Sequence, residues 1–99
     1  MVEAGLLTKL AAWYSEQCDG EWEHFYGVEI TTADNPGWIV KIDLRETPSE
    51  RSNFEKISIR KSEHDWLICQ KKDGRFVGAG DSSKLSTILE HFLRFAGKL

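Results

Sequence analysis

Three residues whose side-chain types could perform nucleophilic catalysis lie close together in the sequence: Cys18, Asp19 and His24. Such catalysis needs a thiolate beside a histidine that accepts its proton, and an acid that orients the histidine. Nothing in the sequence brings these side chains to that geometry, and His24 also fits a half-buried position in a strand. An enzyme that depends on Cys18 or His24 is therefore the last of the alternatives, and we expect no catalytic site.

Residues that could hold a metal ion or a phosphate are not spaced for either task. The three histidines are far apart in the chain, and neither cysteine has a CxxC or HxxxH companion. The segment GAGD, residues 78–81, lacks the GxGxxG spacing and the lysine of a P-loop, and Asp81 would repel a phosphate. We expect these small residues to form a tight junction between a strand and a helix, and we expect no cofactor.

Charge is distributed unevenly along the chain. Residues 1–50 hold three basic and ten acidic side chains, whereas residues 51–99 hold ten basic and six acidic ones. No Lys or Arg lies between Lys9 and Lys41. An acidic surface repels nucleic acid and attracts a basic protein, although it can also be merely solvated. The candidate partner-binding residues lie in this interval: Asp19, Glu21, Glu23, Phe25, Glu29 and Asp34.

The basic side chains of the second half offer a competing interpretation. They would form a nucleic-acid contact near the ends of two hairpins, at Arg60, Lys61, Lys71, Lys72 and Arg75. Acidic residues are interspersed among them, and no RNA-binding aromatic motif accompanies them. We rank this interpretation below protein binding and expect no nucleic-acid partner.

The elements that position these residues begin with a helix and a hairpin. Apolar residues at helical spacing predict a helix over residues 3–17, which the segment CDG ends. From Trp22 to Ile30 the period changes to two, which predicts a long strand whose outer face carries carboxylates around Phe25. The turn residues DNPG, 34–37, then connect this strand to another over 38–44. We expect Trp22 and Trp38 to pack as a cross-strand pair in the core.

The second half predicts three more strands and a second helix. In order, the pattern gives an exposed loop at 45–53, strands at 54–61 and 66–72, the turn Asp73-Gly74, a strand at 75–80, and a helix capped by Asp81 or Ser82. The fold class is therefore α+β, an antiparallel meander of about five strands with an N-terminal and a C-terminal helix. We expect residues 1–99 to form a single domain.

Hydropathy and cysteine usage indicate a cytoplasmic protein. No apolar run approaches the roughly 20 residues of a transmembrane helix, and no basic region precedes the first apolar residues as in a secretory signal. We expect Cys18 and Cys69 to be reduced thiols, with a disulfide as the alternative. An exposed edge strand leaves a monomer or a weak homodimer as the expected oligomeric state.

Seven short motifs together resemble those of the immunity protein 53 family of bacterial polymorphic toxin systems. They are Trp13-Tyr14, Cys18-Asp19-Gly20, the WEH at 22–24, Gly27, the DNPGW at 34–38, Asp65-Trp66, and the GAGD at 78–81. The resemblance implies a small cytoplasmic antidote, encoded beside a toxin, that binds and neutralises the toxin's effector domain. The motif residues Trp22, Asn35, Pro36, Gly37 and Trp38 are expected to be structural.

The resemblance and the charge pattern lead to one hypothesis. If the toxin is a nuclease, its substrate groove is basic, and carboxylates can occupy the groove in place of phosphates and speed association. We therefore expect the acidic interval to be the toxin-binding surface, with Phe25 at its centre.

Overall fold

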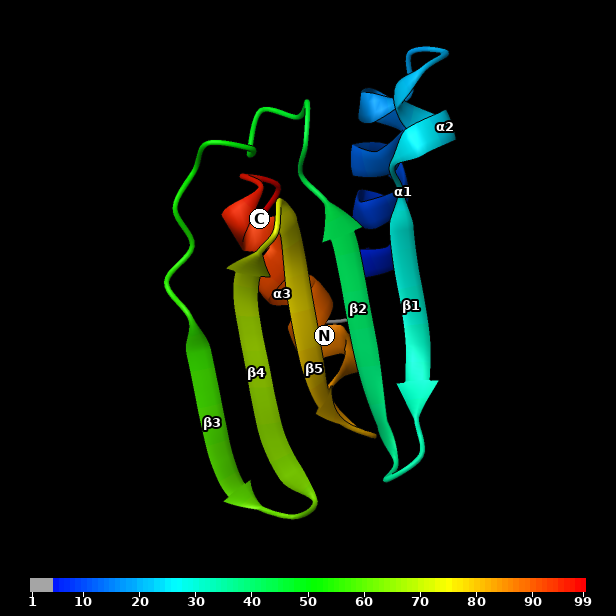
Figure 1. The fold of residues 1–99 in the computed structure, drawn as a ribbon. Helices are drawn as coiled ribbons and strands as arrows, with labels where there is room; N and C mark the ends of the chain where they lie inside the picture. Colours follow the sequence, from blue (N-terminus) through cyan, green and yellow to red (C-terminus); the bar gives the residue numbers. More distant parts are fainter. Residues whose placement is uncertain (1–4) are drawn as a thin grey trace.

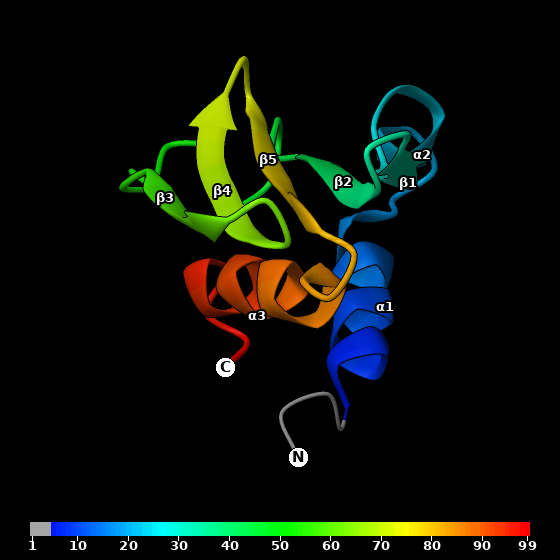
Figure 2. The ribbon, with the colours of Figure 1, turned by 90° about the horizontal axis from the view of Figure 1, so that it is seen from below.

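One five-stranded antiparallel sheet carries the first and last helices of the chain on one face, and a short helix lies beyond its end (Figures 1 and 2). The computed structural model describes residues 5–99. The elements in chain order are α1 (Leu6–Gln17), α2 (Trp22–Phe25), β1 (Val28–Ala33), β2 (Gly37–Asp43), β3 (Ile57–Ser62), β4 (Asp65–Lys72), β5 (Arg75–Asp81) and α3 (Leu85–Phe95). The predicted α+β class, five strands, and helices near the two ends of the chain are confirmed. Residues 3 and 4 of the predicted first helix lie outside the described residues.

The order of the strands differs from that of a simple meander. Across the sheet the order is β1-β2-β5-β4-β3, so the last strand lies in the centre. The segment between β2 and β3 carries the chain to the opposite edge, and β3, β4 and β5 then return as a local meander towards β2 (Figure 1). An alternating pattern specifies which face of a strand is buried, but it does not specify its neighbours, which is why the pattern gave the wrong order.

Glycines in β5 allow α3 to approach the centre of the sheet. A Cβ atom at Gly78 would collide with the side chain of Ile88, and one at Gly80 would lie 2.7 Å from the Cβ of Lys84. The expectation that GAGD forms a tight strand-to-helix junction is therefore confirmed.

The core lies between the sheet and the two longer helices. Phe92 of α3 is fully buried and joins the layers, with its ring centroid 4.9 Å from that of Trp13 and 5.4 Å from that of Phe76. Cys69 of β4 is also buried, and burial raises the pKa of its thiol to about 12. Cys18 and Cys69 are both free thiols, as expected. None of the helices in residues 5–99 has the length and apolar character needed to cross a bilayer.

The long strand predicted from Trp22 to Ile30 is wrong. Residues Trp22–Phe25 form one helical turn, and the strand begins only at Val28. The backbone N–H groups of Gly20 and Trp22 donate to the carboxylates of Glu23 and Asp19, which favours the turn over an extended chain. The predicted Trp22–Trp38 pair is also absent, because Trp22 packs edge-on against Trp13 and Trp38 lies opposite Thr32 and Gly80 in the sheet.

The other connections between strands lie where the turn residues predicted them. Residues 34–36 join β1 to β2, and Asp73 and Gly74, with φ of 53° and 76°, close the β4–β5 hairpin. The predicted exposed loop at 45–53 is partly anchored, since Thr47 and Ser49 are buried and the Thr47 hydroxyl donates to Leu44 O at 2.7 Å.

The start of α3 depends on a buried carboxylate. Asp81, 3% exposed, accepts hydrogen bonds from Ser83 N and Oγ at one oxygen, and from Trp66 N and Lys84 Nζ at the other. Asp81 thus ties β4 and β5 to the segment before α3. The predicted cap lies too early in the chain, because the residue that precedes the helix is Lys84, whose side chain makes no capping hydrogen bond.

Replacing the Asp81 carboxylate with an amide is expected to make the free energy of unfolding less dependent on pH in the acidic range. The hydrogen bond from the Ser83 hydroxyl, then those from Lys84 and the backbone of Trp66, hold the pKa of Asp81 well below its ordinary 3.8 against the effect of burial. A carboxyl group whose pKa is lower in the folded state stabilises the fold fully at a pH above its pKa in the unfolded chain. This stability is lost as the pH falls through the pKa of the folded state. Asp81→Asn should therefore unfold at lower urea than the wild type at neutral pH, and the difference should shrink below pH 3.8. A difference that stays constant down to low pH would contradict this assignment.

Candidate functional site

The connection between α1 and α2 is held by two carboxylates that bond to backbone N–H groups. Asp19 Oδ1 accepts from Glu21 N and Trp22 N, each at 2.9 Å. Glu23 accepts from Asp19 N at 3.0 Å and from Gly20 N at 3.0 and 3.2 Å. The bonds from the Trp22 and Glu21 amides lower the pKa of Asp19, which favours its charged form. Asp19 and Glu23 therefore shape this segment as well as charging it.

Trp22 fixes the segment to the rest of the molecule. Its side chain is 3% exposed, and its Nε1 donates to Arg45 O at 2.8 Å. The indole also packs edge-on against Trp13 of α1, with ring centroids 6.0 Å apart. The short helix α2 is thus built on a buried tryptophan anchor.

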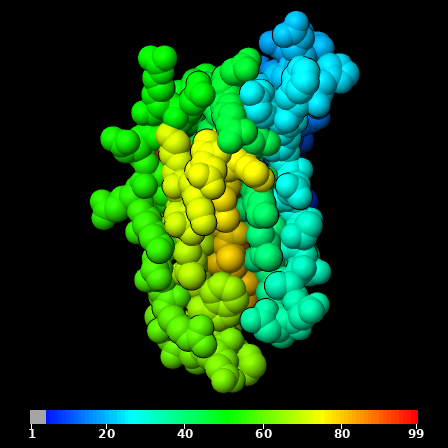
Figure 3. All heavy atoms as spheres, in the orientation of Figure 1, coloured from blue at the N-terminus to red at the C-terminus, as the bar shows by residue number. Residues whose placement is uncertain are grey.

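Phe25 projects from the same helical turn into solvent. Its side chain is 78% exposed, more than that of any other large apolar residue in residues 5–99. Glu21 is exposed beside the turn, and its carboxylate has no hydrogen-bond partner within the described part of the chain. We call Asp19, Glu21, Glu23 and Phe25 the acidic corner, and it projects beyond the end of the sheet, in blue and cyan in Figure 3.

The other two predicted partner-binding residues lie along β1. Glu29 is exposed, opposite Lys41 in the sheet, and its carboxylate lies 3.9 Å from Arg75. Asp34 is exposed in the turn at the far end of β1 (Figure 1). A six-residue strand is about 17 to 20 Å long, so the six predicted residues do not form one compact face. They instead follow the β1 edge of the molecule, from the acidic corner at one end to Asp34 at the other.

The DNPGW residues join two parts of the fold. Asn35 and Pro36 lie in the β1–β2 turn, and a Cβ atom on Gly37 would come within 2.5 Å of Gly80 O in the neighbouring strand. Trp38 is half-buried and donates from Nε1 to Ser82 O at 3.0 Å. These contacts pack the first hairpin against the end of β5.

The residues of the catalytic alternative make separate contacts. The Cys18 thiol donates to Tyr14 O at 3.3 Å, whereas His24 is exposed on α2. Among residues 5–99 there is no group of three or more histidine, cysteine or acidic side chains arranged to hold a metal ion. Cys18 and His24 are therefore not hydrogen-bonded to each other within residues 5–99.

The basic residues of the nucleic-acid alternative are distributed between the two ends of the sheet. Arg60 and Lys61 lie near one end of the sheet, and Lys72 and Arg75 lie near the other (Figure 1). Lys71 is occupied, since its Nζ donates to the carbonyl oxygens of Glu50 and Ser52.

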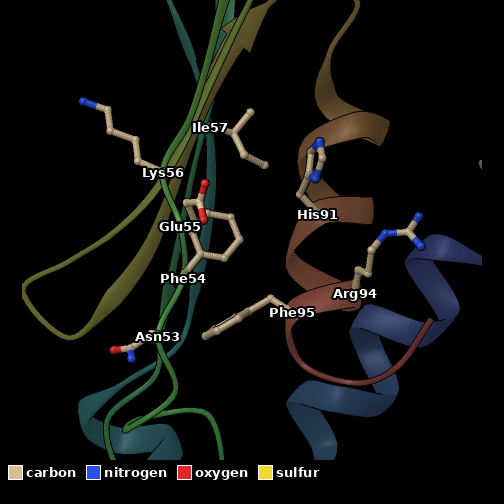
Figure 4. A pocket seen from close by; sticks show the side chains of 8 residues that line it. All are labelled: Asn53, Phe54, Glu55, Lys56, Ile57, His91, Arg94 and Phe95. Carbon is tan, nitrogen blue, oxygen red and sulfur yellow. The ribbon is translucent and has the colours of Figure 1, made fainter.

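A hollow of about 370 Å³ lies between α3 and the segment before β3 (Figure 4). Phe54 and Phe95 pack edge to face within it, with ring centroids 5.2 Å apart, and His91 faces Ile57. Lys56 and Arg94 point away from it, so no set of polar groups converges there. Its aromatic wall is continuous with the core.

Comparison with known proteins identifies the family. The sequence profile described as immunity protein 53 matches residues 7–97, which is nearly the whole chain. No curated protein and no solved structure matches the chain. The match includes α2, the DNPGW turn and the GAGD segment of β5, whose motifs carried the resemblance. The chain belongs to the immunity protein 53 family, and its role is toxin immunity.

Proposed function

We propose that this immunity protein neutralises the effector domain of its cognate toxin by direct binding through the acidic corner, with Glu29 and Asp34 extending the contact along β1. The observation that most directly supports this proposal is the exposure of Phe25. Its side chain is 78% exposed beside carboxylates, on a segment anchored by Trp22. Binding hot spots are often aromatic side chains that become desolvated while polar neighbours exclude water around them. The acidic corner has this composition before any partner is present.

The charge of the corner defines the chemistry of the partner. No Lys or Arg lies between Lys9 and Lys41, so the field over the acidic corner attracts a basic surface. A nuclease toxin has such a surface, because its groove binds phosphates. We propose that carboxylates of the antidote occupy that groove in the cytoplasm of the producing cell and keep nucleic acid out.

Removing the ring of Phe25 is expected to weaken toxin binding without unfolding the chain. Phe25→Ala should raise the dissociation constant for the purified toxin domain roughly 30-fold, which corresponds to about 2 kcal/mol at a central aromatic contact. Thermal unfolding should be unchanged, because the side chain is already 78% exposed. Titration calorimetry measures the affinity, and circular dichroism measures the stability.

A matched control removes another exposed apolar side chain far from the corner. Leu99 at the C-terminal end is 48% exposed, so Leu99→Ala also removes exposed apolar surface, although less than Phe25→Ala does. The control should bind as the wild type does. Equal affinity of Phe25→Ala and Leu99→Ala for the toxin would overturn the assignment of Phe25.

A further inference from the structure

The outer edge of β1 is unpaired in the described part of the chain (Figure 1). Asp43 N donates to Gly27 O, and in an antiparallel pair the bonded residues alternate. In β1 the residues that bond β2 are therefore Glu29, Thr31 and Ala33. It follows that the N–H and C=O groups of Val28, Ile30 and Thr32 point outward, towards a position where another strand can add.

The two edges of the sheet differ in how they are protected. The other edge strand, β3, carries Arg60 and Lys61, and its register shifts between Arg60 and Ser62. Charged residues and bulges of this kind discourage pairing with another chain. In Val28–Ala33 the pairing with β2 is regular, and the segment contains no Lys, Arg or Pro. Of the two edges, only that of β1 keeps the features that permit strand addition.

An apolar groove runs beside this free edge, between α1 and β1. Its volume is about 410 Å³, and its lining residues are Leu7, Leu10, Ala11, Tyr14, Gly27 and Val28. Leu7 is 68% exposed and Ile30 is 37% exposed, although both belong to regular elements. Side chains of an added strand that lie on the same face as Val28 and Ile30 would cover this apolar surface.

Charge specifies the composition of the added strand. On the opposite face of β1, the exposed Glu29 would lie beside the remaining side chains of the added strand. The acidic corner and Asp34 flank the two ends of β1 (Figure 1). Positive side chains are complementary to this arrangement, and a second copy of β1 brings none. A strand of alternating apolar and basic residues therefore fits the edge better than β1 of another copy.

We propose that the toxin domain contributes such a strand, apolar on one face and rich in Lys or Arg on the other, and that it pairs with the free edge of β1. The sheet would thereby extend into the partner, with main-chain hydrogen bonds supplying affinity and the groove selecting side chains. This inference rests on the proposed function, since it describes how the same partner binds. It gives Glu29 and Asp34 a common role with the acidic corner despite the distance between them.

Proline substitution tests strand addition, because proline removes one outward N–H group. Proline is tolerated on an edge strand where the N–H faces solvent, so Ile30→Pro should fold, as circular dichroism can verify. Ile30→Pro should weaken binding of the purified toxin domain on the order of 100-fold, and Ile30→Ala, which keeps the N–H, should weaken it less. The matched control is Ser58→Pro, whose N–H points outward from β3 by the same alternation, and it should bind as the wild type does.

Hydrogen exchange of the wild-type chain gives a readout that does not depend on a variant folding. The amides of Val28, Ile30 and Thr32 should exchange rapidly in the free chain and become protected when the toxin domain binds. Equal affinity of Ile30→Pro and Ser58→Pro, unchanged exchange at these amides in the complex, or their protection in a free homodimer would each overturn strand addition by the toxin. Failure of the wild-type chain to bind the toxin domain would instead overturn the proposed function.

Discussion

Trp22→Ala is expected to lower the free energy of unfolding by about 3 to 5 kcal/mol, the usual cost of removing a buried tryptophan. Trp22 is 3% exposed and makes edge contacts with Trp13 and Tyr14, with ring centroids 6.0 Å away in each case. The variant also removes the donor to Arg45 O. The cavity would open where α2 rests on α1, so the acidic corner should lose its support and the affinity for the toxin should fall as well.

Urea unfolding measures this loss, and a second variant separates its causes. Trp22→Phe retains most of the ring but not the N–H that binds Arg45 O, so it should cost about 1 to 2 kcal/mol. The expected order of stability is wild type, then Trp22→Phe, then Trp22→Ala. If Trp22→Ala unfolds within about 1 kcal/mol of the wild type, Trp22 is not the anchor of α2.

Phe92→Ala is expected to have a destabilising effect of the same size, about 3 to 5 kcal/mol, without a direct effect on the acidic corner. Phe92 has no exposed surface and contacts Trp13 of α1 and Phe76 of β5. Its removal would leave a cavity where the two helices meet the sheet. Because small domains are stable by only about 5 to 15 kcal/mol, the variant should unfold at markedly lower temperature.

Calorimetric or urea unfolding at equal protein concentration measures this second effect. Phe92→Leu keeps an apolar side chain and should cost less than Phe92→Ala, about 1 to 2 kcal/mol. At a temperature where Phe92→Ala is still folded, its affinity for the toxin should equal that of the wild type. An intact core in Phe92→Ala, with unchanged unfolding, would contradict the central position of Phe92.

The sequence predicted the elements whose signals are local. The DNPG and Asp73-Gly74 turns, and the C-terminal helix, each depend on residues close together in the chain, and the structure confirms all three. The segment from Trp22 to Phe25 was misassigned because its alternation of apolar and charged residues also fits one helical turn. The hydrogen bonds of Asp19 and Glu23 favour the helix, and their strength cannot be read from periodicity.

The candidate site shows a similar division. The exposure of Phe25 was predicted from its place on the outer face of a strand, and the structure confirms the exposure although the residue lies on α2. Glu21, Glu23 and Glu29 were expected on one face of a single strand, whereas of these three only Glu29 lies in a strand. The free edge of β1 depends on which strands are neighbours, and the groove beside it depends on where α1 packs. Both are tertiary features that no local pattern specifies.

Co-expression with the toxin domain encoded beside this chain tests direct neutralisation at the acidic corner. One culture carries the wild-type chain and another carries the double variant Glu21→Lys/Phe25→Ala, and each is assayed for growth and for toxin retained on the tagged antidote. The wild-type chain should restore growth and retain stoichiometric toxin, and the folded double variant should do neither. Growth restored without a retained complex, or equal protection by the double variant, would contradict neutralisation through this corner.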